Sequence, residues 1–471
     1  LVRWMSRGYG YSSGPGGARR LSVLALLLWP LLVPAPRAYA ATRSLAEVVD
    51  EYVREGLGSN LALRSQGFDV ERAIAALDEA RAGFFPDLSL AGRYSRNEGG
   101  REFVLPLSRI NPALEDETVS FLRERDQDSH ASLSQPPYAP AIPATLRAQR
   151  AQLAASGFAR LALARRLKRD IAVGYLDWLG ATKTVAIVDA SRTLLEENLR
   201  VNESLYGNGK LTQDQVLRAR AELLEVEQQL RESRNLAQQA RRYLNFLLNR
   251  PLEGALEATE VEQAARQAAA DPATLEADAL ARRPELAGAD STTQAAAAQA
   301  DAARAALKPT LGLGVDAGIQ GEDYGTGHGY NYGQVSLQLS WKLFDGGANR
   351  AAVRAARALE RRAATQRAEL ALQIQLEVRQ AVDRLATAAD SLATAEARSQ
   401  AARAGFRIAS RKRDEGMISQ VEFIDARSTL TRAELNLNLT RFALLTRQAE
   451  LDYVTAAGTL PVDPLAPGST P

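Results

Sequence analysis

Residue types that could carry out chemistry are few in this chain of 471 residues. The chain has no cysteine, which excludes disulfides and thiolate metal sites. Its two histidines, His130 and His328, stand apart from clustered acids, and we expect no metal ion to bind at either. The sequence contains no nucleophile elbow, no pair of catalytic carboxylates and no redox motif. We therefore predict a protein that is not an enzyme and that needs no cofactor.

One glycine-rich segment, residues 324–330, contains spaced glycines of the kind that can bind phosphate. A phosphate-binding loop of that type opens a helix, whereas this segment lies between two stretches with a strand pattern. We predict a loop that joins two strands.

Two polar pairs have the spacing of a helix start. Thr212 and Gln215, and again Ser419 and Glu422, each follow a glycine and are three residues apart. In such a capping box the hydroxyl accepts from a backbone N–H, and the second side chain reaches back to the first residue. The pattern predicts two sharp helical hairpins.

The elements that carry these turns are predicted to be long helices. No proline interrupts residues 144–206 or 348–413, and about 65 residues at a rise of about 1.5 Å make a rod of roughly 100 Å. Val378, Val382 and Leu385 begin an alternating spacing of four and three residues that indicates a coiled-coil seam. Alanine at many seam positions explains why only 6% of the chain is aromatic.

Three stretches recur once each in the same order, which indicates an internal duplication. The pairs are residues 80–90 with 303–313, 133–138 with 339–344, and 209–220 with 416–427. We divide the chain into a signal peptide (1–40), a first structural repeat (41–250), a connecting segment (251–283), a second structural repeat (284–457) and a tail (458–471). The proline-rich tail is predicted to be disordered.

Each repeat contains two predicted strands in which apolar and polar residues alternate. The clearest cover residues 87–95, 310–319 and 334–343, and a weaker one lies around residues 131–138. About ten residues of alternation are typical of the wall of a transmembrane barrel. Four strands cannot enclose a lumen, and an open edge in lipid leaves backbone groups unpaired, so other subunits must complete the barrel. A soluble four-stranded sheet with one solvent-exposed face remains the alternative.

The N-terminal segment has the features of an export signal. Arg19 and Arg20 precede the apolar run 21–33, and a small-residue cleavage site follows at 38–40. This run of roughly 13 residues is shorter than the ~20 that span a bilayer, which disfavours a membrane anchor. No cysteine follows for lipid attachment, and we find no later apolar stretch long enough to cross a membrane as a helix. The excess of basic over acidic residues lies in this N-terminal export signal and not in the rest of the chain, so we expect no nucleic-acid partner.

Several short motifs, taken in order, carry a family resemblance. Pro86 and Pro309 each precede a strand, and residues 343–347 lead into the second long helix. The segment after the second turn fits the pattern Gly-x-x-Ser/Thr-x-x-acid-x-Leu/Ile-x-Ala through Gly416, Ser419, Glu422, Ile424 and Ala426. The first repeat fits the same pattern, except that Gln215 replaces the acid. By these motifs the mature chain resembles the TolC family of bacterial outer-membrane efflux channels, in the branch without a lipid anchor.

This resemblance implies a fold and a function. The fold would be mostly helical with transmembrane strands: a homotrimer whose 12-stranded β-barrel, four strands per protomer, continues into a long periplasmic barrel of coiled-coil helices. The protein would lie in the bacterial outer membrane, extend into the periplasm and serve as the passive exit duct of a tripartite efflux or type I secretion system. Its partners would be a periplasmic membrane-fusion adaptor, an inner-membrane pump and outer-membrane lipid. The alternative is a periplasmic coiled-coil scaffold or adaptor, which would be soluble without detergent.

The resemblance also implies site residues. Glu422 and Asp425 correspond to acids that line the narrow periplasmic entrance and select cations, and threefold repetition would arrange them as a ring of carboxylates. Arg218, the first-repeat equivalent of Asp425, is expected to be its partner in a salt bridge that closes the entrance. The adaptor is expected to dock on the two hairpin tips, formed by Gly209, Lys210, Leu211, Gly416, Met417 and Ile418.

Overall fold

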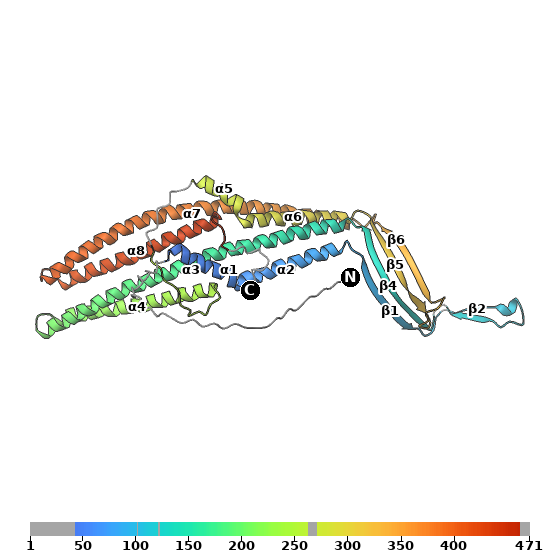
Figure 1. The fold of residues 1–471 in the computed structure, drawn as a ribbon, viewed down its shortest axis with the longest axis horizontal. Coiled ribbons are helices and arrows are strands. Elements are labelled where there is room, and N and C mark those ends of the chain that lie inside the picture. The colour runs from blue at the N-terminus through green and yellow to red at the C-terminus, as the bar shows by residue number, and fades with distance from the viewer. Residues whose placement is uncertain (1–42, 101, 121–122, 262–270, 462–471) are drawn as a thin grey trace, which may run out of the picture. The chain divides into compact units, whose positions relative to one another are not determined.

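The computed structural model describes residues 43–100, 102–120, 123–261 and 271–461. The predicted signal peptide (1–40) and residues 462–471 of the predicted tail lie outside the described residues. Within the described part the protein is mostly helical, and a four-stranded sheet continues from the ends of four of the helices (Figure 1).

Two of the described helices are very long. The described helices are α1 (Leu45–Ser59), α2 (Leu61–Ala82), α3 (Ala141–Gly207), α4 (Gln213–Leu247), α5 (Pro272–Arg282), α6 (Pro284–Ala305), α7 (Ala348–Asp414) and α8 (Gln420–Val454). The two predicted long helices are confirmed as α3 and α7, of 67 residues each. Helix α3 begins three residues earlier than predicted and includes Pro143 in its first turn. Proline is tolerated there because N–H groups of the first turn have no intrahelical acceptor, so the helix loses no hydrogen bond.

Helix α3 is the central helix of the bundle. It packs along α2, α4, α6 and α8, whereas α7 packs mainly on α8 and α6. The largest core cluster lies where α1, α3, α4 and α8 meet, around the fully buried side chains of Ile171, Tyr175 and Leu244. Close contact of α3 with α8 requires Gly180, because a Cβ at that position would lie 3.0 Å from the Phe442 ring.

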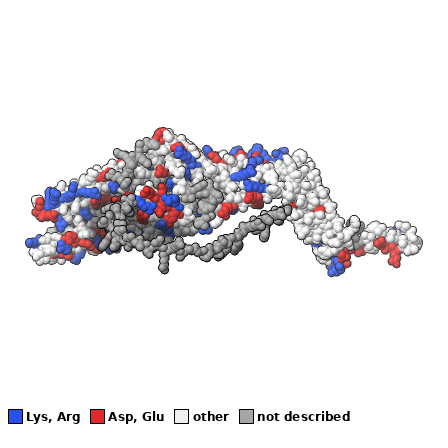
Figure 2. Space-filling view, in the orientation of Figure 1, with Lys and Arg blue, Asp and Glu red and all other residues white. Residues whose placement is uncertain are grey.

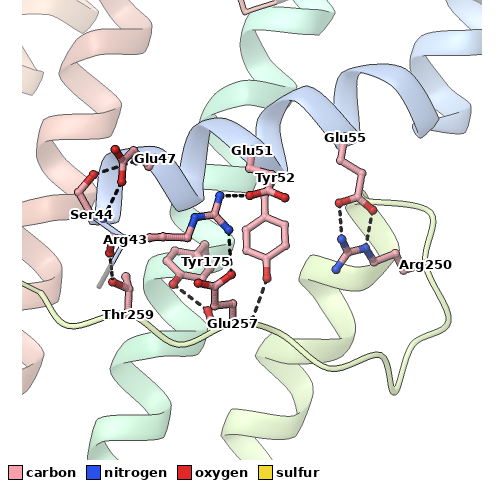
Figure 3. Close-up of polar contacts among 10 residues, drawn as sticks. All are labelled: Arg43, Ser44, Glu47, Glu51, Tyr52, Glu55, Tyr175, Arg250, Glu257 and Thr259. Atoms are coloured by element: carbon pink, nitrogen blue, oxygen red, sulfur yellow. Dashed lines mark hydrogen bonds and ion pairs between the residues drawn. The ribbon is translucent and has the colours of Figure 1, made fainter. Parts of the chain in front are cut away.

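The start of the described chain is fastened to the segment that follows α4 (Figure 3). Arg43 forms ion pairs with Glu51 of α1 and with Glu257. The backbone N–H of Glu257 donates to the Tyr52 hydroxyl and its carbonyl accepts from the Tyr175 hydroxyl, both at 2.9 Å. Burial raises the pKa of Tyr175 to about 12. These contacts hold the beginning of the predicted connecting segment against α1 and α3.

The predicted strands are confirmed and form one antiparallel sheet in the order β1-β4-β5-β6. The strands are β1 (Asp87–Arg96), β4 (Arg125–Tyr138), β5 (Thr310–Gly321) and β6 (Asn331–Ser340). The pairing of β4 with β5 shifts between Gln135 and Tyr138, where two prolines have no N–H to donate to the ladder. The predicted extension of β6 to residue 343 is wrong, because Ser340 already pairs with the first residue of β5, Thr310.

The register of the sheet separates apolar from polar residues. One face carries Leu88, Leu90, Tyr94, Leu133, Leu313, Val315, Val335, Leu337 and Leu339. Many of these side chains are open to the surroundings, with Leu90 84% and Val335 74% exposed. The opposite face carries mostly Ser, Asp, Gln and Gly. On the side shown in Figure 2, charged side chains gather over the helices and are sparse over the sheet.

The long connection between β1 and β4 contains a second hairpin that the sequence pattern did not reveal. Strands β2 (Glu102–Leu105) and β3 (Glu117–Ser120) form a two-stranded sheet of their own among the described strands, and a 3-10 helix, η1 (Leu107–Arg109), lies between them. In Figure 1 this hairpin extends beyond the end of the four-stranded sheet. The strands have four residues each, too few for the alternation that marks the main sheet.

The sequence led us to expect no apolar stretch after the export signal that is long enough to cross a membrane as a helix, and this expectation is wrong. Helix α3 contains an 18-residue stretch that is long and apolar enough to cross a membrane. Half of that stretch is buried inside the protein, as it is in a core helix of a folded bundle.

Candidate functional site

The two hairpin turns have the same backbone geometry. After α3, Gly209 has a φ of 68°, and after α7, Gly416 has a φ of 74°. In each turn the glycine N–H and the following N–H donate back to carbonyls in the last turn of the helix, at 2.7 to 2.9 Å. This is the Schellman arrangement, in which the left-handed position favours glycine because it has no Cβ.

The helices that leave the turns are capped differently. The Ser419 hydroxyl accepts from the Glu422 N–H at 3.3 Å, and a Glu422 carboxylate oxygen accepts from the Ser419 N–H at 3.0 Å. The predicted capping box of α8 is therefore confirmed. The predicted box of α4 is wrong: the Thr212 side chain makes no cap hydrogen bond, because the Gln215 N–H donates instead to the Thr212 carbonyl at 3.3 Å.

The predicted entrance residues lie close to these turns. Glu422 and Asp425 are exposed and three residues apart on the first turns of α8, and Arg218 is exposed on α4. Among the described residues no ion pair joins Arg218 to Asp425. The side chain of Glu422 is held by the cap, whereas those of Asp425 and Arg218 extend into solvent.

The predicted tip residues are mostly open to solvent. Met417 is 63% exposed, and Gly209, Lys210 and Gly416 are also exposed. The two remaining tip residues, Leu211 and Ile418, are half-buried because they line a groove between the two hairpins.

This groove has a volume of about 930 Å³. It brings together five of the predicted residues, namely Lys210, Leu211, Arg218, Gly416 and Ile418. Glu422, Asp425, Gly209 and Met417 are not part of its lining. The predicted set thus divides into residues that line the groove and residues that lie outside it.

Two asparagines in the groove were not predicted. Asn198 and Asn202 of α3 are each only 2% exposed, and both line the groove. The Asn198 Oδ1 accepts from Gln420 Nε2 at 3.1 Å, which connects the two hairpins. Neither Asn198 Nδ2 nor Asn202 Nδ2 has a hydrogen-bond partner in the described part of the chain. An unpaired buried amide is costly in free energy, so these two groups are available to an acceptor that enters the groove.

Polar contacts continue along the seam between α3 and α8. Ser191 and Thr431 are joined by a hydroxyl hydrogen bond of 3.3 Å, and Asn438 Nδ2 donates to the Gly180 carbonyl at 2.9 Å. Ser191 and Asn198 are seven residues apart, the spacing of one seam position in a coiled coil. Small polar residues at a heptad spacing were the sequence signal that could have revealed this seam.

The hairpin of α7 and α8 contains a stack of arginines and aromatic rings near its tip. The guanidinium of Arg413 lies 4.0 Å from the Phe423 ring centre, the rings of Phe423 and Phe406 are 5.6 Å apart, and Arg427 lies 5.6 Å from the Phe406 ring. Burial lowers the pKa of both arginines. The stack holds this hairpin together, and Phe406, Arg413 and Phe423 of the stack also line the groove between the hairpins.

The described residues contain no group of three His, Asp or Glu side chains that could hold a metal ion. His130 lies on the polar face of the sheet, where its Nδ1 is 2.8 Å from an Asp128 oxygen. His328 lies in the loop that joins β5 to β6.

Comparisons with known proteins agree with this architecture. Residues 275–457 match the model of the family described as outer membrane efflux protein. Protein CyaE of Bordetella pertussis is 32% identical over 158 residues, which are 33% of this chain and 33% of that protein. Multidrug resistance outer membrane protein MdtP of Escherichia coli is 24% identical over 404 residues, which are 83% of this chain and 80% of that protein.

A solved structure extends the similarity to the fold. The crystal structure of the CmeC outer membrane channel of Campylobacter jejuni superposes on this structure with a TM-score of 0.76 and 18% sequence identity. The superposition covers 88% of this chain and 86% of that chain. The sequence match to the outer membrane efflux protein family covers residues 275–457, and most of the chain shares the fold of a solved bacterial outer membrane channel.

Proposed function

We propose that the protein is a passive exit duct of a tripartite efflux or type I secretion system. Three copies form a 12-stranded barrel in the outer membrane and a helical tunnel in the periplasm. An inner-membrane pump supplies the energy, and a periplasmic adaptor joins the pump to the tunnel. The observation that carries the proposal is a sheet with one apolar and one polar face, open at both edges, joined to long helices.

The sheet edges support assembly from several copies. Among the described strands, β1 pairs only with β4 and β6 pairs only with β5, so each edge strand presents unpaired backbone groups. In lipid such an edge costs several kcal/mol for each unpaired group. Pairing of β1 in one copy with β6 in the next closes the barrel, with the apolar face toward lipid and the polar face toward the lumen.

In the described part of the chain, the helices also present large apolar side chains that one copy leaves exposed. Large exposed apolar residues lie on α2, α4 and α7, and include Phe68, Ile74, Leu217, Leu224, Leu236, Leu359, Leu372 and Leu376. Contact between neighbouring copies buries such surfaces in an assembly. These residues therefore support a trimer in which the helices of adjacent protomers pack side by side.

We assign the periplasmic entrance to the acidic turns of α8. Glu422 and Asp425 of three copies form a ring of carboxylates in a narrow opening, and such a ring favours cations. Arg218 of one copy pairs with Asp425 of a neighbouring copy when the entrance is closed. The exposure of both side chains in the single chain is consistent with a partner in another copy.

We assign adaptor docking to the tips and to the groove between them. Gly209, Lys210, Gly416 and Met417 offer an exposed rim, and Leu211 and Ile418 offer apolar contacts. At the base of the groove, Asn198 and Asn202 present unpaired amide donors. An adaptor tip that carries a carbonyl or carboxylate oxygen fits this groove.

Two structural repeats are part of the same proposal. The order α2-β1-β4-α3-α4 in residues 41–250 matches α6-β5-β6-α7-α8 in residues 284–457. Residues 251–283 connect the two repeats.

Two observations bear on which class of compound the channel exports. The described residues contain no cluster of metal ligands, and MdtP is named for multidrug resistance. We therefore favour organic compounds or polypeptides over metal ions.

Fractionation and bilayer recordings test the proposal. We expect the full chain in the outer membrane, as a trimer that resists sodium dodecyl sulfate until heated, and as an ion channel after reconstitution in a planar bilayer. Membranes from cells that lack the gene are the control. Recovery in the soluble periplasm without channel activity would instead support a coiled-coil scaffold.

A further inference from the structure

A polar cluster occupies the middle of the sheet, on the face away from the exposed apolar residues. A carboxylate oxygen of Asp128 lies 2.8 Å from His130 Nδ1 and accepts from the Tyr332 hydroxyl at 3.3 Å. Next to this group, the Ser132 hydroxyl donates to the Asp316 carboxylate at 2.5 Å. The cluster joins β4, β5 and β6.

A glycine makes this arrangement possible. Gly318 pairs with His130 on one side and with Tyr332 on the other. A Cβ on Gly318 would lie 2.7 Å from the His130 Cα and 2.4 Å from the Ser129 carbonyl oxygen, so only glycine fits. The two rings lie over this gap, 6.4 Å apart, and their positions are fixed by the shared Asp128 carboxylate.

The charges around His130 are mostly negative. The titratable or charged groups that face it are Arg93 of β1, Asp126 and Asp128 of β4, Asp316 of β5 and Tyr332 of β6. Arg93 forms an ion pair with Asp126 at 3.2 Å and lies opposite Asp128 in the ladder, so that among the described groups two aspartates, Asp128 and Asp316, share little basic charge while His130 is neutral.

We propose that this cluster is a second cation-selecting site of the channel, in the barrel lumen, and that His130 makes its selectivity depend on pH. This inference rests on the proposed assembly of three copies with their polar sheet faces toward the lumen. The cluster would then occur three times around the pore axis. It is separate in sequence and in the fold from Glu422 and Asp425 at the helical tips.

The chemistry of histidine gives the direction of the pH effect. A carboxylate beside Nδ1 favours the tautomer with a proton on that nitrogen, which leaves Nε2 to gain the second proton. Imidazole is the side chain whose charge ordinarily changes between about pH 5 and 8. Protonation places a positive charge beside Asp128 in each copy and lowers the net negative charge of the cluster. Cation preference should therefore fall as the lumen is acidified.

The reversal potential of the reconstituted channel in a potassium chloride gradient measures this preference. We expect the potassium-to-chloride permeability ratio of the wild type to fall at least twofold when the pH of the compartment on the barrel side is lowered from 7.5 to 5.5. His130→Gln should remove most of this pH response. Asp316→Asn should lower the ratio at both pH values.

The chain offers a matched control, because His328 is the only other histidine. His328→Gln should keep the pH response of the wild type, since His328 lies in the β5–β6 loop and outside the cluster. The carboxylates at the periplasmic tips face the other compartment, which stays at pH 7.5 throughout.

The outcomes separate this inference from the proposed channel function. A wild-type protein that forms no pores contradicts the channel itself, and the inference with it. A conducting His130→Gln channel with an unchanged pH response overturns the inference alone, and so does an Asp316→Asn channel with wild-type selectivity. A trimer that resists sodium dodecyl sulfate shows that each variant has folded.

Discussion

Gln420 of α8 donates a hydrogen bond of 3.1 Å to Asn198 of α3, and the two residues are 222 positions apart. The contact joins the hairpin of the second repeat to that of the first, beside the groove between the tips. Its acceptor is almost completely buried. Loss of the donor leaves a buried oxygen unpaired, at a cost of about 1–3 kcal/mol.

We expect Gln420→Ala to loosen the two hairpins and to raise the single-channel conductance of the reconstituted trimer. Gln228→Ala is the matched control, because Gln228 donates to Glu232 within the exposed surface of α4, at 3.0 Å. Conductance that is equal in the two variants would show that the contact does not hold the entrance.

The unequal caps of α4 and α8 give a second prediction. Ser419→Ala removes a hydroxyl that accepts from the Glu422 N–H and should destabilise the second hairpin by about 1 kcal/mol. Thr212→Ala removes a hydroxyl with no cap hydrogen bond and should have a much smaller effect. Hydrogen exchange of the first turns of α8 and α4 measures both changes. Equal increases in exchange would contradict the difference between the caps.

The entrance ring gives a third prediction. Asp425→Asn should lower the potassium-to-chloride permeability ratio, because it removes one carboxylate per copy from the narrow opening. Glu422→Gln should lower the ratio too, yet keep α8 capped, since glutamine can also serve as the second residue of a capping box. Glu225→Gln, at an exposed position farther along α4, is the control for a general effect of charge. If the three variants share the wild-type ratio, Glu422 and Asp425 do not line the entrance.

A fourth prediction concerns the ion pairs where α6 meets α7. The side chain of Arg283 is only 6% exposed and pairs with Glu285 at 2.9 Å and with Glu377. Arg283→Met leaves these carboxylates without their partner and should cost about 3–5 kcal/mol of stability. Arg282→Met removes only an exposed pair with Asp278 and should cost less than about 1 kcal/mol. Thermal unfolding followed by circular dichroism compares the two, and equal losses would contradict the role of the buried pairs.

The same cluster predicts how stability depends on pH. Burial acts to raise the pKa of Glu285, but the hydrogen bonds and the charge of Arg283 outweigh it, so the pKa is lowered. A lowered pKa in the folded state adds stability that is fully present above the unfolded value, about 4.3. This part is lost as the pH falls through the lowered pKa. We expect the Glu285→Gln variant to show a flatter decline of unfolding temperature below about pH 4.3 than the wild type.

Local sequence patterns predicted the main elements because each pattern has a direct physical cause. The absence of proline over residues 144–206 and 348–413 allowed unbroken backbone hydrogen bonds, and both helices formed. Period-2 alternation marked the strands whose apolar face is exposed. The pattern of β4 was weak because Gln127, Ser129 and Gln135 occupy positions on its apolar face and because two prolines interrupt its ladder. β4 is nevertheless a central strand, held by pairing on both sides.

What the sequence did not reveal depends on contacts between distant segments. Thr212 and Ser419 sit in nearly the same local pattern, but only the Ser419 hydroxyl accepts from the N–H three residues on, whereas the Gln215 N–H donates to the Thr212 carbonyl. Asn198 could not be linked to Gln420 without knowing that α3 and α8 lie side by side. The groove between the tips was hidden for the same reason.

The last prediction tests which face of the sheet meets lipid. Leu337 and Gln338 are neighbours in β6 whose side chains point to opposite faces, Leu337 to the apolar side and Gln338 to the polar side. An arginine on the lipid face of a barrel costs about 2–4 kcal/mol at the middle of the bilayer, whereas one in the lumen stays in water. We expect Leu337→Arg to reduce the amount of heat-dissociable trimer in the outer membrane, and Gln338→Arg to assemble normally and shift the channel toward anions. The reverse pattern would place the polar face toward lipid and would contradict the barrel, because both variants add the same charge to the same strand.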